Sequence, residues 1–274
     1  MLLALPAAVP AAVQAIDYSY QTAEPQNTTW PLMAEERAYV IETPEHDRRP
    51  VRESNKHLPK LWPVVPSAGH FSGDAWFKRH AAHGKIVQSN QGPLDMLLVG
   101  DSITIQRGGL SVKHFPQRKP IDIDIGSDKT QNVLWRLDHG GVARPQPKAI
   151  VLMIGNSNMF FIPDTGIEAA VQGIETCMKN LHEKFPESAI ILAKILPPHA
   201  AGIQEDIKKT NATMDPVKVE ADLKVCVIDL WADFTNADGT IKKDLFTPDD
   251  IHRSTAGCAV YAAKLKPMLR NLTP

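Results

Sequence analysis

A serine, an aspartate and a histidine in this sequence have the types and the order of a nucleophile with its base. Ser102 lies in "VGDSIT", directly after the apolar run 96–99, and Asp249 lies three residues before His252 in "TPDDIHRS". A serine hydroxyl attacks a carbonyl when an imidazole takes its proton and a carboxylate fixes the imidazole tautomer. In a tight loop, positions i and i+3 can share a side, so these three residues are the predicted catalytic set. Asp250 is the alternative acid.

The elements that must position these residues alternate between strand and helix patterns. Continuous apolar runs of the kind buried on both faces of a sheet predict strands over 96–99, 121–125, 149–154, 189–195 and 224–229. Helical patterns are expected over 76–88, 166–184 and 255–269, the second with apolar residues at spacings of four and three. Strands separated by helices predict a parallel five-stranded sheet inside a three-layer α/β/α sandwich. Ligands of such sheets bind beyond the carboxyl ends of the strands, where Ser102 lies.

Four sequence blocks occur in a fixed order along the chain. They read "VGDSIT", "DIGSDKTQNVLWRL", "MIGNSNMF" and "DDIH". In this order they resemble the four blocks of the SGNH, or GDSL, hydrolases, and the segment T-x-x-V-L-W-R-L resembles the platelet-activating-factor acetylhydrolase-like branch. The resemblance covers about 76–272 and implies a flavodoxin-like fold and a serine esterase. It also implies that Ser102 is the nucleophile, His252 the base and Asp249 the orienting acid.

The oxyanion hole is where the sequence departs from the family it resembles. The glycine of the second block falls on Ser127, and the asparagine of the third block falls on Ser157, which Asn158 follows. The position of Ser127 donates its backbone N–H, although a serine does not adopt glycine-only backbone angles cheaply. The hydroxyl of Ser157 is shorter than a carboxamide, so a water, a shifted loop or Asn158 must reach the oxyanion. Losing one such donor costs about 3 to 4 kcal/mol of transition-state stabilisation.

The first 75 residues differ in composition from the rest. Residues 1–15 are apolar and end in Val-Gln-Ala, which predicts a truncated signal segment and a secreted or periplasmic protein. No basic residue precedes Arg37, so a disordered start and a cytoplasmic location are the alternative. Residues 16–75 are rich in proline and charge and predict an extended N-terminal arm, ahead of an SGNH-hydrolase-like catalytic domain over 76–274. No apolar stretch is long enough to span the roughly 30 Å of a bilayer core.

The charge, cysteine and histidine content limits the classes of partner, metal and cofactor that this chain is expected to bind. The formal net charge of −1 gives no field that would attract nucleic acid. Cys177, Cys226 and Cys258 form no C-x-x-C pair, and each is expected to be a small buried apolar residue. His80 and His83 have helical spacing for a metal but no third ligand, so two exposed or half-buried histidines are expected. No metal and no organic cofactor is expected.

These observations predict a serine esterase that hydrolyses a short-chain ester, in particular an acetyl ester, through an acyl-enzyme. The substrate would be a small molecule or, for an exported protein, an acetylated carbohydrate. Two alternatives stay open: a non-catalytic carbohydrate- or protein-binding relative with a weakened oxyanion hole, and an acyltransferase. The sequence does not define the oligomeric state.

Overall fold

The structure is a computed structural model. It describes residues 74–90, 92, 94–104, 113–118, 120–139, 146–161, 166–198, 201–214 and 225–272. The predicted signal segment (1–15) and all of the predicted arm up to residue 73 lie outside the described residues.

A five-stranded parallel sheet forms the centre of the fold. Its strands are β1 (Leu94–Gly100), β2 (Pro120–Asp122), β3 (Pro147–Met153), β4 (Ala189–Ala193) and β5 (Val225–Ile228), in the order β2-β1-β3-β4-β5. The chain winds outward in both directions from β1, so the carboxyl end of β1 is the topological switch point at which ligands of such sheets bind. Ser102 lies in the loop that begins where β1 ends, and the predicted fold class is confirmed.

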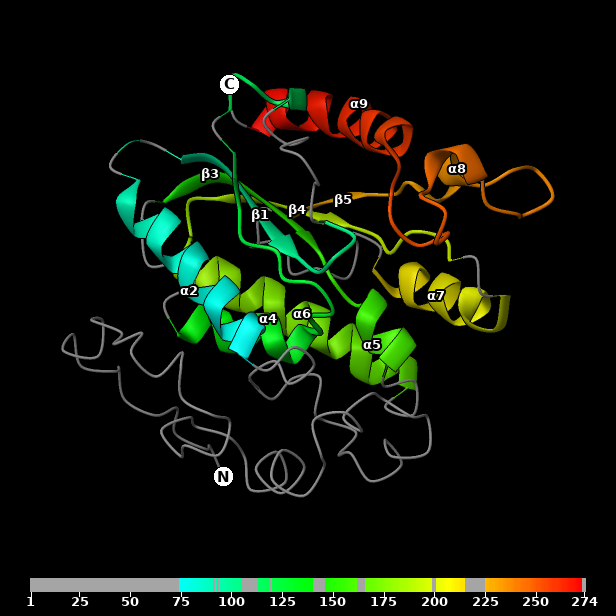
Figure 1. The fold of residues 1–274 in the computed structure, drawn as a ribbon, viewed down its shortest axis with the longest axis horizontal. Coiled ribbons are helices and arrows are strands. Elements are labelled where there is room, and N and C mark those ends of the chain that lie inside the picture. Colours follow the sequence, from blue (N-terminus) through cyan, green and yellow to red (C-terminus); the bar gives the residue numbers. More distant parts are fainter. Residues whose placement is uncertain are drawn as a thin grey trace.

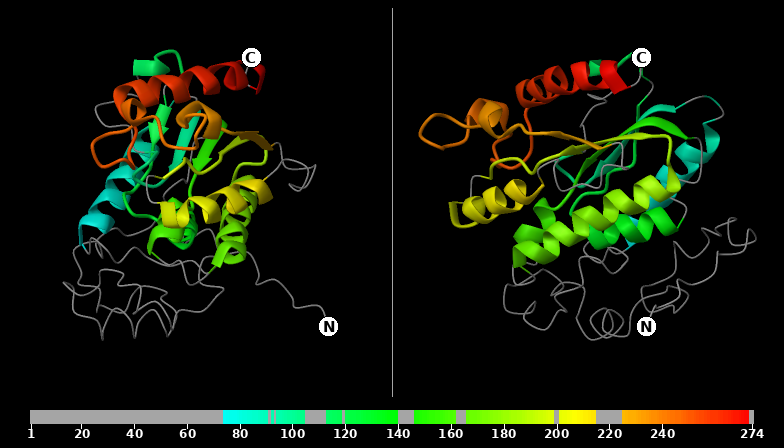
Figure 2. Two further views of the ribbon diagram at one scale, coloured as in Figure 1. Left: turned by 90° about the vertical axis from the view of Figure 1, so that its right-hand side faces the viewer. Right: turned by 180° about the vertical axis from the view of Figure 1, so that it is seen from behind.

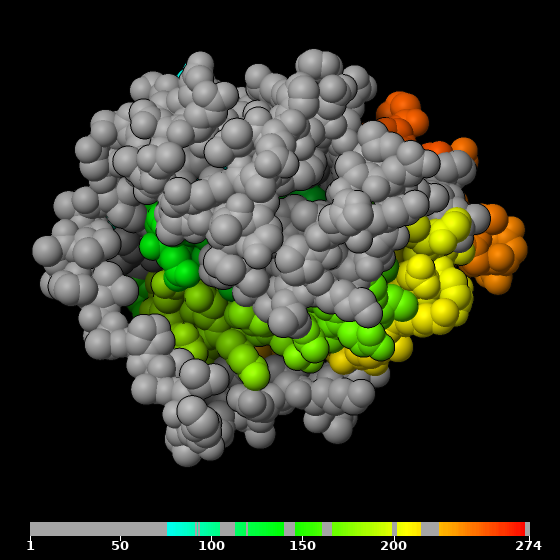
Figure 3. Space-filling view, turned by 90° about the horizontal axis from the view of Figure 1, so that it is seen from below, coloured from blue at the N-terminus to red at the C-terminus, as the bar shows by residue number. Residues whose placement is uncertain are grey.

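Helices cover both faces of this sheet (Figures 1 and 2). The lower layer in Figure 1 contains α2 (Asp74–Ser89), α4 (Thr130–Asp138), α5 (Asn156–Phe161), α6 (Gly166–Lys184) and α7 (Ala201–Thr213). The upper layer contains α9 (Thr255–Leu272), beside which lie α8 (Trp231–Phe234) and the 3₁₀ turn η8 (Lys243–Leu245). Parts of α6 and α7 are visible from below (Figure 3). Among the described residues no helix has both the length and the apolar character that crossing a membrane requires.

Each layer encloses its own apolar core against the sheet. Residues of β1 alternate between the two cores: Leu97 and Val99 pack with α4 and α6, whereas Met96 and Leu98 pack with α9. This alternation explains why the strands read as continuous apolar runs in the sequence.

The apolar pattern is a poor guide to β2 and α4. The second strand was expected over 121–125, but β2 ends at Asp122, although Ile123 and Ile125 still donate hydrogen bonds to backbone oxygens of Leu98 and Gly100. The apolar pattern does not delimit α4, because its residues from Thr130 to Leu137 are all buried, polar ones included, and no polar face marks the helix. By contrast, α6 has the predicted bounds.

Candidate active site

The loop that carries Ser102 is held by buried neighbours. Asp101 is 1% exposed; its Oδ1 accepts a hydrogen bond from the Ile103 backbone N–H at 2.9 Å, and its carbonyl accepts one from the Thr104 N–H at 3.1 Å. The Thr104 hydroxyl donates to the Met153 carbonyl at 3.2 Å, which ties the loop to β3. Ser102 itself is half-buried. A half-buried serine on a loop anchored on both sides can meet a substrate without moving its backbone.

Asp249 and His252 lie together ahead of α9. Asp249 Oδ2 lies 2.7 Å from His252 Nδ1, and Asp249 Oδ1 accepts the backbone N–H groups of Ile251 and His252 at 2.9 Å each and the Thr247 hydroxyl at 2.7 Å. Partial burial would raise the pKa of Asp249, but these hydrogen bonds outweigh it and hold the pKa well below its ordinary value. The carboxylate is therefore ionised and fixes the ring, with Nε2 left to exchange a proton.

Asp250, the alternative acid, takes a different position. Its Oδ2 lies 3.4 Å from Lys243 Nζ, and its φ is +56°. The geometry therefore supports Asp249 as the partner of His252.

Ser127 lies beside the serine loop with a left-handed backbone. A Cβ added at the neighbouring Gly126 would lie 3.7 Å from the Ser102 Cβ, so the second block adjoins Ser102. The φ of Ser127 is +64°, a conformation that suits the glycine found in the family and strains a residue with a Cβ by about 1 to 2 kcal/mol. Ser127 thus has a backbone conformation that a glycine would adopt without strain.

The side chains of Ser157 and Asn158 already have partners inside the protein. The Ser157 hydroxyl donates to Asp101 Oδ2 at 3.2 Å. Asn158 Oδ1 accepts the backbone N–H of Thr130 at 3.0 Å, while its Nδ2 donates to the Thr130 hydroxyl at 3.0 Å and to Gln131 Oε1 at 3.4 Å. Asn158 therefore satisfies the start of α4. An indication in the sequence is that the N-cap residue of α4 is Lys129, a residue type that does not cap helices well.

The first and fourth blocks are joined through neighbours of the predicted catalytic residues. Arg253 Nη2 donates to the Ile103 carbonyl at 2.8 Å. In the part of the chain that the structure describes, no hydrogen bond joins Ser102 to His252, and bonds of this kind often tighten only when substrate binds. Sequence reasoning did not single out Arg253, because its partner is a backbone carbonyl 150 residues away.

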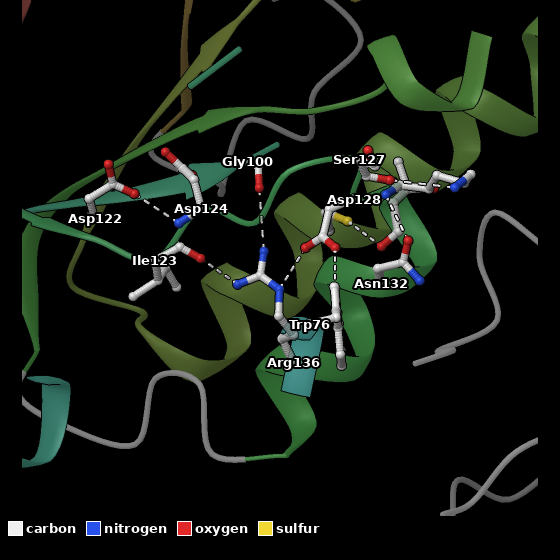
Figure 4. A network of polar contacts seen from close by, with 12 residues as sticks. Trp76, Gly100, Asp122, Ile123, Asp124, Ser127, Asp128, Asn132 and Arg136 are labelled. Carbon is white, nitrogen blue, oxygen red and sulfur yellow. Dashed lines mark hydrogen bonds and ion pairs between the residues drawn. The ribbon is translucent and has the colours of Figure 1, made fainter. Parts of the chain in front are cut away.

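A buried ion pair supports the second block from the α4 side (Figure 4). Arg136 Nε lies 2.7 Å from Asp128 Oδ2, and its two terminal nitrogens donate to the carbonyls of Ile123 (2.7 Å) and Gly100 (3.4 Å). The Trp76 indole donates to Asp128 Oδ1 at 2.6 Å. Arg136 thus fixes the end of β1 against the segment that leads to Ser127.

The expectation that His80 and His83 are exposed or half-buried is wrong. Their exposed fractions are 0% and 3%, and the His80 ring packs on Trp76 of α2 and Trp135 of α4. Burial, helped by the charge of Arg136, lowers the pKa of His80 to about 3. No group of three or more metal-ligating side chains occurs among the described residues.

The three cysteines are reduced and differ in burial. Cys177 and Cys258 are buried as expected, whereas Cys226 on the edge strand β5 is only half-buried.

The fold and the sequence blocks of this chain resemble those of the SGNH (GDSL) hydrolases, and they support an ester hydrolase of that type. Over 201 residues the chain is 27% identical to platelet-activating factor acetylhydrolase IB subunit alpha2 of Rattus norvegicus, which covers 71% of this chain and 82% of the relative. No protein-family model matches the chain.

Two solved structures show the same fold. A GDSL-like lipase from Bacteroides thetaiotaomicron matches with a TM-score of 0.57 at 16% identity, over 71% of this chain and 97% of that one. A carbohydrate esterase family 3 from Talaromyces cellulolyticus matches with a TM-score of 0.51 at 16% identity, over 65% of this chain and 97% of that one.

Proposed function

We propose that this esterase removes a short acyl group, in particular acetyl, through a covalent intermediate on Ser102. The observation that carries this proposal is the 2.7 Å contact between Asp249 Oδ2 and His252 Nδ1, in a loop where the other carboxylate oxygen is braced by three donors. An imidazole held in this way has one tautomer, and its Nε2 serves as the base.

The reaction has two halves. In the first, Ser102 Oγ attacks the ester carbonyl carbon while its proton passes to His252 Nε2; the alcohol then leaves with that proton, and the acyl group stays on Oγ. In the second, water attacks the acyl carbon and gives its proton to Nε2, and the serine leaves with it. Asp249 stays ionised throughout and stabilises the imidazolium.

The oxyanion needs hydrogen-bond donors beside Ser102. We favour the backbone N–H of Ser127, since the side chains of Ser157 and Asn158 bond within the fold. A backbone donor costs no reorganisation when the charge develops.

The substrate class rests on the relatives. The rat relative is named an acetylhydrolase and the Talaromyces neighbour a carbohydrate esterase. We therefore propose an acetyl ester as substrate. For an exported protein, which the first 15 residues predict, the alcohol would be a carbohydrate.

Ser102→Ala tests the function directly. Hydrolysis of aryl acetate, butyrate and octanoate esters should be lost in this variant, the wild type should prefer the acetate, and an organophosphonate should label Ser102. An unlabelled Ser102 with no turnover would indicate the binding relative instead. Turnover that depends on an added sugar acceptor would indicate the acyltransferase.

Asp249→Asn and Asp250→Asn form a matched pair. The first should lower kcat by on the order of 10³ to 10⁴, because the wrong tautomer forms. The second should change it by less than about threefold, because its carboxylate faces Lys243 and an ion pair of this kind contributes little. The opposite ranking would contradict the assignment of the acid.

A further inference from the structure

Arg253 is a buried arginine directly after His252. It is 7% exposed, and its guanidinium carbon lies 4.3 Å from the ring centroid of Tyr261 in α9. Its backbone pairs with Phe246 in an isolated antiparallel bridge. Burial raises the pKa of Tyr261 to about 12, so the ring stays a neutral phenol and offers a π face to the cation. The side chain is thus held in one place by its own segment and by α9.

From this place Arg253 reaches the serine loop. Its Nη2 donates to the Ile103 carbonyl at 2.8 Å, and the Ile103 N–H is bound by Asp101 Oδ1. Ile103 directly follows Ser102. Among the described residues, this is the one hydrogen bond between segment 101–104 and segment 246–254. It therefore joins the backbone beside the nucleophile to the backbone beside the base.

Packing alone does not explain an arginine at position 253. Arg253 Nε and Nη1 and the Tyr261 hydroxyl are buried and have no hydrogen-bond partner in the part of the chain that the structure describes. No described carboxylate lies within 4.0 Å of the guanidinium to form an ion pair. Buried donors without partners destabilise a fold, and an apolar side chain of similar length would avoid this. An apolar side chain such as methionine could fill the same space, but it could not donate the hydrogen bond to the Ile103 carbonyl.

We propose that Arg253 is a positioning residue that sets the separation of His252 from Ser102 by holding the Ile103 carbonyl. This inference rests on the proposed function, because it assumes that these two residues exchange a proton. Arg253 does not contact the substrate. Its loss moves the two loops relative to each other, and a misplacement of about 1 Å can slow a reaction by about 100-fold.

Arg253→Met separates this role from a packing role. We expect kcat for an aryl acetate to fall by about 10- to 100-fold with KM changed by less than about threefold, since geometry and not substrate binding is lost. The melting temperature should stay equal or rise, because the unpartnered donors are removed. Arg253→Lys keeps one donor without the planar fork and should lie between the two.

Arg118→Met is the matched control. Arg118 Nη2 also donates to a backbone carbonyl, that of Leu269 at 3.2 Å, but at the far end of α9 from His252. Its replacement should leave kcat unchanged.

Chemical rescue decides the case in which a variant is also destabilised. In Arg253→Ala the missing group leaves space for ethylguanidinium, and millimolar ethylguanidinium should restore part of kcat there but not in Ser102→Ala. A wild-type kcat in Arg253→Met would overturn the proposal, as would a loss of kcat in Arg253→Ala that ethylguanidinium does not restore. Activity retained in Ser102→Ala would instead overturn the proposed function, whatever Arg253 does.

Discussion

Arg136 and Arg253 hold the same stretch of backbone from opposite layers of the sandwich. They differ in whether a carboxylate pairs with the charge of the guanidinium. Arg136, from α4, donates to the carbonyls of Gly100 and Ile123 and pairs with Asp128 at 2.7 Å, whose second oxygen accepts the Trp76 indole (Figure 4). Arg253, from the α9 side, donates to Ile103 and has no described carboxylate partner. The Arg136 guanidinium thus has a carboxylate and two carbonyls as partners, which suits stability, whereas the Arg253 guanidinium keeps unpartnered donors next to the candidate active site.

Two aspartates four residues apart repeat this contrast. Asp128 lies in the bonded network, while both oxygens of Asp124 are buried without a hydrogen-bond partner among the described residues. Ile123 packs in the core on the α4 side, and the next side chain, that of Asp124, points away from that of Ile123 (Figure 4). Burial, together with the nearby Asp122, raises the pKa of Asp124 well above its ordinary value. This shift favours the protonated form of the Asp124 carboxyl.

Breaking the α4 network should have the largest effect. Asp128→Ala leaves the Arg136 charge buried and unpaired, so the free energy of unfolding should fall by about 3 to 5 kcal/mol in urea titrations. The double variant with Arg136→Met should recover much of this loss, because no buried charge remains. Asp233→Ala, which removes the surface pair with Lys264 (3.0 Å), should lower the same free energy by less than about 1 kcal/mol. Equal losses in Asp128→Ala and Asp233→Ala would mean that the buried pair of Arg136 contributes no more to stability than a surface pair. The contrast between Arg136 and Arg253 would then fail.

Asp124→Asn should change the way in which the free energy of unfolding depends on pH. The folded-state pKa is raised, so the carboxyl stabilises the fold fully below the ordinary value of 3.8, and this stabilisation is lost as pH rises toward the folded pKa. The loss is about 1.4 kcal/mol per pH unit in that window. Asparagine cannot ionise, so the variant should match the wild type near pH 4 and become relatively more stable as pH rises.

The control for this pH dependence has the opposite sign. The pKa of Asp249 is depressed, so its contribution is present above the ordinary value and is lost as pH falls through the folded pKa. Asp249→Asn should therefore lose stability relative to the wild type at neutral pH and approach it in acid. If the stability curves of the wild type and Asp124→Asn run parallel from pH 4 to 8, the prediction is contradicted. The Asp124 carboxylate would then have a partner that stabilises its charge.

The parts of this protein that sequence could predict are those that repeat a local pattern. The apolar runs predicted all five strands, and the stripe from Ile167 to Leu181 predicted α6 to its ends. The roles of Arg136 and Arg253 were not predictable, because each side chain binds backbone carbonyls that are distant in the chain. Every residue has a carbonyl, so no residue type in the sequence marks the partner. The pairing of Asp249 with His252 was predictable from a spacing of three within one loop.

Ser127→Gly should have the smallest effect, and it tests whether the loop beside Ser102 uses its backbone or its side chain. At φ +64° the serine is strained by about 1 to 2 kcal/mol, which glycine removes, while the greater freedom of glycine in the unfolded chain offsets about 0.5 to 1 kcal/mol of that gain. We therefore expect a rise in unfolding free energy of about 1 kcal/mol or less. Asp250→Gly, at φ +56°, should gain less, because aspartate tolerates this conformation better than serine. Since the backbone N–H is the proposed oxyanion donor, kcat for an aryl acetate should not change in Ser127→Gly. A fall of tenfold or more at unchanged stability would mean that the Ser127 hydroxyl itself contacts the reacting group.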